Sequence, residues 1–168
     1  MKFLIVVDMQ VDFITGALGS EHAKKIVPNV VDKVKNYNGK IIFTRDTHYE
    51  NYFTTQEGKK LPVLHCVKDT DGWQICSELA PYVKNVVDKI TFGSVDLPSI
   101  IKSYGEDIEE IELCGLCTDI CVISNAMVLK TAFPETKIIV DSSCSAGVTI
   151  KSHNTALEAM KSVQIEII

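Results

Sequence analysis

Short apolar runs alternate with amphipathic stretches along the whole chain. Six of these runs are rich in β-branched residues, which is typical of strands covered on both faces of a parallel sheet. The predicted strands are 3–7, 40–44, 85–89, 108–113, 137–140 and 163–167. Between them, helical patterns predict helices over 29–37, 73–79, 97–104, 119–132 and 150–161.

The order of these elements predicts the fold class. Repeated strand–helix–strand units imply right-handed crossovers and therefore a doubly wound α/β fold, a three-layer sandwich around a mainly parallel six-stranded sheet. The segment 46–71 is the long exception, and a loop of that length without an element of its own is usually functional. The chain has 168 residues and no internal repeat, which suits a single domain spanning 1–168.

Polar residues stand at the ends of the predicted strands. Asp8 follows the first strand, Asp46 and His48 follow the second, Lys89 ends the third, and a cysteine cluster follows the fourth. Open α/β sheets bind ligands outside the carboxyl ends of their strands. We therefore expect four kinds of group to lie at one edge of the sheet: an acid, an Asp–His pair of the kind that binds metals, a lysine and a thiol.

Composition narrows the class of partner. The net charge is −5 and Arg45 is the only arginine among 17 basic residues, which argues against nucleic acid or a large polyanion. No apolar run approaches the roughly 20 residues that span a bilayer, so no membrane partner is expected. The apolar N-terminal run meets Asp8 too early for a signal peptide, and we interpret it as a buried strand. We therefore expect a cytoplasmic protein whose six cysteines are reduced.

Three cysteines, Cys114, Cys117 and Cys121, fall close together between a predicted strand and a predicted helix. Thr118 is a good N-cap, which would place Cys121 in the first helical turn, where free backbone N–H groups favour a thiolate. Two other interpretations compete: a thiol packed in the core, and a CxxC redox pair of Cys114 and Cys117. A zinc site would need a second such pair, which the sequence lacks.

The residues expected on the same rim favour a nucleophile. Asp8 can take the thiol proton and later pass it to a leaving amine, while Lys89 can stabilise the thiolate. Each residue alone has an ordinary explanation, Asp8 as a turn residue and Lys89 as a solvated strand end. Their joint placement with Cys121 is hard to explain by packing.

Two motifs resemble those of the isochorismatase-like cysteine hydrolases. Residues 7–13, VDMQVDF, resemble the family opening D-x-Q-x-D-F, and residues 115–122, GLCTDICV, resemble its nucleophile segment G-x-x-T-D-x-C-V. The resemblance extends over essentially the whole chain. It implies a non-proline cis peptide before one cysteine and an oxyanion hole made by two backbone N–H groups. The residues that it implies are Asp8, Lys89 and Cys121 for the catalytic triad, and Cys117 and Cys121 for the oxyanion hole.

The long loop contains metal-ligand residue types. Asp46 and His48 open the loop, and Glu57 and His65 follow. These oxygen and nitrogen donors suit zinc, iron or manganese. Judged on ligand type rather than spacing, a metal site is favoured over ordinary loop residues.

The metal-type residues carry a further resemblance. A D-x-H pair followed by a histidine near P-x-x-H-C is similar to the metal site of nicotinamidases, in which the metal binds the pyridine nitrogen of the substrate. Many members place another histidine six residues after the D-x-H histidine, where this chain has Thr54; Glu57 matches a variant with glutamate. We predict one divalent metal, zinc in the first place, with iron or manganese as alternatives.

Together these features predict a metal-assisted cysteine amidohydrolase that converts nicotinamide to nicotinate and ammonia through a thioester. Phe13 and Phe92 are candidate walls for the flat ring, with core packing as the alternative. Isochorismatase itself is disfavoured, because its vinyl-ether hydrolysis works without the nucleophilic cysteine and its dicarboxylate substrate would need more cationic contacts. A carbamoyl or ureido amidase of the same superfamily and a redox protein using Cys114 and Cys117 remain alternatives. The resemblance also suggests a homo-oligomer, and His153, without a pattern, is interpreted as a surface residue.

Overall fold

A computed structural model describes residues 1–105 and 107–168, and its centre is a six-stranded sheet in which all neighbouring strands are parallel. The strands are β1 Lys2–Val7, β2 Lys40–Asp46, β3 Val86–Lys89, β4 Glu110–Leu116, β5 Lys137–Ala146 and β6 Glu166–Ile167. Their order across the sheet is β3-β2-β1-β4-β5-β6. The prediction of a doubly wound α/β fold is confirmed.

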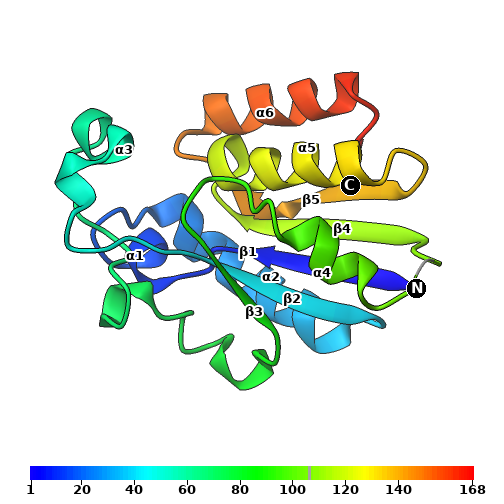
Figure 1. The fold of residues 1–168 in the computed structure, drawn as a ribbon, viewed down its shortest axis with the longest axis horizontal. Coiled ribbons are helices and arrows are strands. Elements are labelled where there is room, and N and C mark those ends of the chain that lie inside the picture. Colours follow the sequence, from blue (N-terminus) through cyan, green and yellow to red (C-terminus); the bar gives the residue numbers. More distant parts are fainter. Residues whose placement is uncertain (106) are drawn as a thin grey trace.

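Helices cover both faces of the sheet (Figure 1). One face packs against α4 Leu97–Lys102, α5 Ile123–Ala132 and α6 Ile150–Ser162, and the other against α1 Val11–Ile14 and α2 Glu21–Asn36. Side chains of β1 enter the two cores alternately, because Phe3 and Ile5 join one hydrophobic cluster while Leu4 and Val6 join the other. Burial on both faces explains why this strand is a continuous apolar run.

Some local predictions are wrong. Residues 73–79 form no α-helix. Trp73 ends the 3-10 turn η2 Asp71–Trp73, and the 3-10 turn η3 Ala80–Tyr82 begins directly after the segment. Between them, Cys76 N–H donates to Met9 O (2.9 Å). The apolar side chains of this segment therefore pack from irregular chain rather than from a helix. The predicted helix 29–37 begins earlier, at Glu21, because Ser20 caps it by accepting from Ala23 N–H.

The long loop 46–71 contains short elements that its sequence did not indicate. The 3-10 turn η1 Tyr52–Thr54 is followed by α3 Gln56–Lys60, whose N-cap Thr55 accepts from Gly58 N–H (3.0 Å). This helix carries Glu57, so a predicted metal ligand stands on a regular element within the loop.

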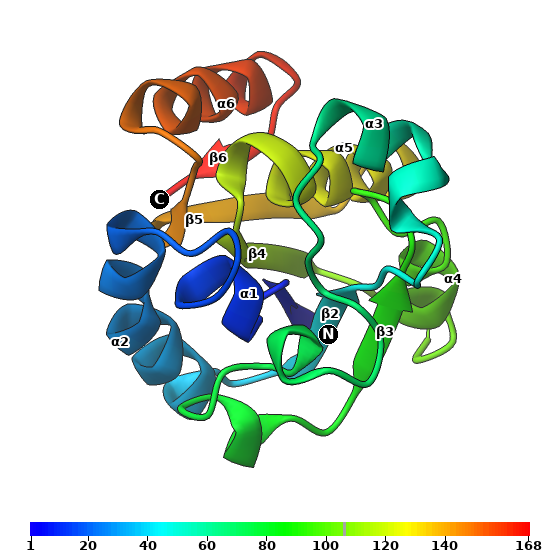
Figure 2. The ribbon, with the colours of Figure 1, turned by 90° about the vertical axis from the view of Figure 1, so that its left-hand side faces the viewer.

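The strand order reverses beside β1, since the chain runs outward from β1 to β3 and then returns to β4 on the other side. Doubly wound sheets bind ligands at this switch point, outside the carboxyl ends of the strands. Figure 2 looks onto this end of the sheet, where α1 lies in front of the strands. Among the described helices, none has both the length and the apolar character to cross a membrane.

Candidate active site

Asp8 lies directly after β1, at the switch point, with no exposed surface. Its N–H donates to Thr44 O (3.2 Å), and the Thr44 hydroxyl donates to Asp8 Oδ1 (2.6 Å). The neighbouring β4 approaches closely because Gly115 has a φ of 118° and a Cβ there would collide with the Val7 carbonyl. Thr44 of β2 thus binds Oδ1 of Asp8, and Oδ2 of Asp8 is left to contact other groups.

Lys89, the last residue of β3, places its ammonium among three predicted site residues. Its Nζ lies 2.6 Å from Asp8 Oδ2, 3.4 Å from Cys121 Sγ and 3.5 Å from Asp46 Oδ1. All four side chains are buried. The structure therefore brings the predicted acid, lysine and thiol together, and Lys89 joins them to the first of the predicted metal ligands.

Burial and pairing set the charges of this cluster. Burial lowers the pKa of Lys89, but Asp8, Cys121 and Asp46 raise it well above its ordinary value, so Lys89 is a cation. Burial raises the pKa of Asp8 despite the opposing effect of Lys89. Burial also raises the pKa of the Cys121 thiol, again opposed by Lys89. A thiol of raised pKa needs an adjacent base to react, and of the two carboxylates that contact Lys89, Asp8 lies nearer to it, at 2.6 Å against 3.5 Å for Asp46.

Cys121 lies in a short π-helix, η4 Thr118–Val122, which follows β4 through Cys117. The peptide bond between Leu116 and Cys117 is cis, as the resemblance implies. Two amides of η4 donate to the Cys117 carbonyl, at 3.0 and 3.1 Å. Cys117 and Cys121 therefore stand at the two ends of one tight turn.

The prediction that Thr118 is the N-cap is wrong. Cys117 precedes the helix and makes no side-chain cap, while Thr118 is its first residue. The Thr118 hydroxyl is instead hydrogen-bonded to His153 Nδ1 on α6 (2.8 Å). His153 is partly buried, and its ring bonds η4 to α6, a contact that the sequence did not indicate.

The predicted metal ligands converge beside the end of β2. Ligand atoms of Asp46, His48, Glu57 and His65 all lie within 4.8 Å of one another. His48 Nε2 is 2.9 Å from Asp46 Oδ2 and 3.5 Å from Glu57 Oε1. His65 Nε2 is 3.5 Å from the same Asp46 oxygen and 3.8 Å from the same Glu57 oxygen. The structure brings all four side chains together, with α3 positioning Glu57.

These donors fit a divalent metal. His65 Nδ1 donates to Val63 O (2.8 Å), which leaves its Nε2 lone pair facing the cluster. His48 Nε2 is buried and, among the described residues, has no aligned hydrogen-bond partner. Burial raises the pKa of Asp46, but His48, His65 and Lys89 together lower it below its ordinary value, which keeps a carboxylate between the two imidazoles. Two imidazole nitrogens and two carboxylate groups match the donor set that zinc accepts.

Gln10 is a site residue that the sequence reasoning missed. Its Nε2 donates to the carbonyls of Asp46 and Trp73 (2.9 Å each), and its Oε1 accepts from Asp46 N–H (2.8 Å). Asp12 accepts from Cys66 N–H (2.8 Å), next to a predicted ligand. These two residues fix the backbone of the metal-type cluster, and the available signal was their place in the D-x-Q-x-D-F opening.

The two predicted ring walls lie near different parts of the site. Phe13, partly buried in α1, has its ring centre 5.5 Å from that of His65. Phe92 is 44% exposed, and its carbonyl accepts from Asn125, whose amide also donates to Cys121 O. Phe13 is thus at the metal-type cluster, and the backbone of Phe92 is beside the thiol residue.

The remaining thiols give no support to redox chemistry. Cys114 and Cys144 are buried in the core that faces α2, as the core interpretation predicts. Burial raises the pKa of Cys114 well above its usual range and that of Cys117 to about 12. All six cysteines are free thiols. Thiolates, which redox exchange requires, are therefore disfavoured at Cys114 and Cys117.

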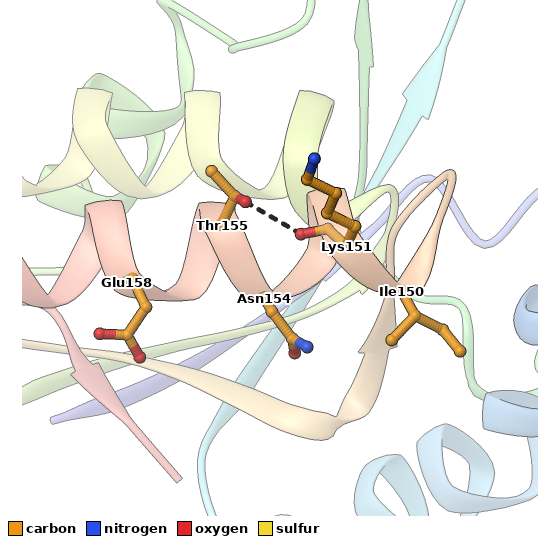
Figure 3. Close-up of a pocket in the computed structure, with 5 residues that line it drawn as sticks. All are labelled: Ile150, Lys151, Asn154, Thr155 and Glu158. Carbon is orange, nitrogen blue, oxygen red and sulfur yellow. Dashed lines mark hydrogen bonds between the residues drawn. The ribbon is translucent and has the colours of Figure 1, made fainter.

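A shallow pocket on the outer side of α6 lies apart from these groups (Figure 3). It is lined by Ile150, Lys151, Asn154, Thr155 and Glu158. The hydrogen bond between Thr155 Oγ1 and Lys151 O (3.0 Å) is an ordinary bond within the helix. This lining contains neither a thiol nor a cluster of side chains that could hold a metal.

An all-parallel doubly wound sheet with a thiol, a lysine and a carboxylate buried at its switch point is the architecture of an α/β hydrolase. The chain belongs to the isochorismatase family, since residues 2–168 match the Isochorismatase domain. A comparison with curated proteins gives no significant match.

Solved structures extend this comparison. Pyrazinamidase of Pyrococcus horikoshii in complex with zinc is 28% identical, with 99% of this chain and 98% of that chain covered and a TM-score of 0.82. Pyrazinamidase/nicotinamidase from Streptococcus mutans is 27% identical, with 100% of both chains covered and a TM-score of 0.87. N-carbamoylsarcosine amidase from Thermoplasma acidophilum is 24% identical, covers 99% of this chain and 94% of that chain, and has a TM-score of 0.81, a likeness of fold.

Proposed function

We propose that this isochorismatase-family hydrolase is a metal-assisted cysteine amidohydrolase that converts nicotinamide to nicotinate and ammonia. The observation that carries the proposal is the position of Lys89, which contacts Cys121, Asp8 and Asp46 and so connects the thiol and acid to the metal-type cluster. A ring amide held at one end by a metal can present its carboxamide to the thiol at the other. The similarity to a zinc-bound pyrazinamidase and to a pyrazinamidase/nicotinamidase supports this substrate class.

One divalent ion, zinc or else iron or manganese, would be held by Asp46, His48, Glu57 and His65. When bound, the ion supplies a Lewis-acid contact for the pyridine nitrogen. Gln10 keeps Asp46 in place for this role by bonding both polar groups of its backbone. Phe13, beside His65, offers an apolar face to the ring.

The reaction itself uses residues of the strand ends. Asp8 takes the proton of the Cys121 thiol, and the Lys89 cation stabilises the thiolate as it forms. The sulfur attacks the carboxamide carbon, and the backbone N–H groups of Cys117 and Cys121 bind the oxyanion. Asp8 then protonates the amide nitrogen, and the C–N bond breaks to release ammonia and leave the thioester. With Asp8 as base, water hydrolyses the thioester, which releases nicotinate and restores the thiol.

The charge of the site favours a neutral amide. Among the described residues, Lys89 is the one lysine in contact with the thiol, and Asp8 and Asp46 already balance its charge. A ureido acid would bring a carboxylate beside the thiol, where the described residues offer no lysine or arginine that is free to pair with it. The same argument disfavours a dicarboxylate such as isochorismate.

An ammonia-release panel tests the proposal. The substrates are nicotinamide, pyrazinamide, a ureido acid and isochorismate, and the proteins are the wild type, Cys121→Ala and Cys144→Ala. We expect the wild type and Cys144→Ala to release ammonia from the two ring amides, because the thiol of Cys144 lies in the core. In Cys121→Ala the rate of release should fall about 10³-fold or more. If Cys121→Ala kept a tenth of the activity, or if the ureido acid were the preferred substrate, the proposal would be wrong.

A further inference from the structure

Asn125 lies one helical turn after Cys121 and has no exposed surface. Its Oδ1 accepts from Ser94 N–H (2.9 Å), and its Nδ2 donates to Cys121 O (2.8 Å) and Phe92 O (3.2 Å). The oxygen and both N–H donors of this amide are therefore engaged. One side chain fastens the segment that follows Lys89 to the residue that carries the thiol.

Gly93 shows how closely this segment lies against α5. A Cβ at residue 93 would be 3.2 Å from both the carbonyl carbon and the carbonyl oxygen of Ser124. Residues 92–94 are thus in contact with the start of α5, and a Cβ at residue 93 would require this contact to widen by a few tenths of an ångström. Ser94 is itself buried.

The fastened segment presents apolar side chains to solvent. Ile90, Phe92 and Val95 are 69%, 44% and 78% exposed, although the segment that contains them begins at the buried Lys89. An accessible aromatic side chain whose backbone is linked through Asn125 to the thiol residue is available to pack against a flat ring. Where its backbone sits relative to Cys121 then decides how well a ring can be held there.

We propose that Asn125 is a positioning residue for substrate binding. It holds residues 92–94 at a fixed distance from Cys121, and it thereby sets the place of Phe92 as a wall for the ring of the substrate. This inference rests on the proposed function. Because Asp8 and Lys89 are held by other contacts, loss of the Asn125 bonds should affect KM more than kcat.

A double-mutant cycle with Phe92 tests the role. It uses whichever amide of the panel the wild type hydrolyses fastest, and compares Asn125→Ala, Phe92→Ala and the double variant. Each single variant should raise KM about 10-fold with kcat changed less than about 3-fold, and the double variant should resemble Phe92→Ala. Asn125→Asp keeps the acceptor for Ser94 N–H but replaces Nδ2 with an oxygen that faces the carbonyls of Cys121 and Phe92, so its KM should rise at least as much as in Asn125→Ala. Multiplicative effects on KM, or a loss confined to kcat, would overturn the role.

A second measurement does not depend on catalysis. Amide hydrogen exchange of Ser94 should be at least about 10-fold faster in Asn125→Ala than in the wild type, while the amides of β4 keep their protection. Gly93→Ala, which leaves the Asn125 amide intact, should raise KM in the same direction and covers the case that Asn125→Ala fails to fold. Unchanged Ser94 exchange, or an unchanged KM in Gly93→Ala, would contradict the inference. A wild type inactive on the whole panel would instead defeat the proposed function, and the exchange rate would still decide whether Asn125 holds the segment.

Discussion

Replacing Lys89 with methionine tests whether the charges buried at the switch point depend on one another. The substitution removes the ammonium 2.6 Å from Asp8 Oδ2 and retains most of the side-chain volume. Asp8 and Lys89 are 0% and 3% exposed, so solvent cannot replace the lost partner. Breaking a buried pair from one side costs about 3–5 kcal/mol, which is a large part of the roughly 5–15 kcal/mol that stabilises a domain.

The cost should also depend on pH. Burial already raises the pKa of Asp8, and the loss of Lys89 removes the main effect that opposes this rise. A carboxyl whose pKa is raised on folding stabilises the folded state fully below its unfolded pKa of about 3.9, and that stability is lost as pH rises through the folded pKa. The deficit of Lys89→Met relative to the wild type should therefore be larger at about pH 8 than at about pH 5.

Urea unfolding of the metal-free proteins at both pH values measures this deficit. Lys137→Met is the matched control, because Lys137 is 48% exposed in its pair with Glu166 and its loss should cost less than about 1 kcal/mol. Hydrolysis by Lys89→Met should also fall, since the thiolate loses its cation. A deficit below about 1 kcal/mol at pH 8, or one equal at both pH values, would refute the reasoning.

Two further predictions concern residues outside the triad. Lys33 contacts Glu112 and lies 2.7 Å from Asp141 Oδ2. Burial raises the pKa of Asp141, but Lys33 and Ser143 together with Cys144 lower it below its ordinary value. The stability that this pairing provides above the unfolded pKa of Asp141 is therefore lost as pH falls. Lys33→Met should lower the free energy of unfolding by about 3 kcal/mol at neutral pH and by less in acid, and urea titrations showing no such convergence would contradict this. Gln10→Leu should weaken zinc binding about 10–100-fold, because the backbone of Asp46 is no longer held. Chelator competition measures this affinity, and an unchanged zinc affinity in the folded variant would show that Gln10 does not position the ligand.

The sheet was predictable because its strands are buried on both faces. In β1, residues 3–7 enter two hydrophobic clusters alternately, so the sequence pattern is a continuous apolar run. The prediction of a helix over 73–79 was wrong because Trp73, Ile75 and Leu79 are buried by packing of an irregular segment. Such packing can leave apolar residues at a spacing that resembles a helix. The early start of α2 had a local signal in Ser20, but Pro28 and the polar first turns obscured it.

Convergence of the site was predictable from topology, since the carboxyl ends of parallel strands meet at one edge. Asp8, Asp46 and Lys89 all follow or end strands and lie together as expected. Gln10 and Asn125 were not predictable in the same way, because each is an uncharged amide whose partners are backbone groups of distant segments. Such bonds exist only once the fold has brought those segments together.

Ammonia release from nicotinamide by metal-free protein, before and after zinc is restored, tests the central claim most directly. The claim requires both the metal-type cluster and the thiol that Lys89 connects to it. We expect little turnover without metal, recovery with zinc in the wild type, and no recovery in His48→Ala or in Cys121→Ala. Equal rates with and without zinc, or zinc-dependent turnover in Cys121→Ala, would contradict the account.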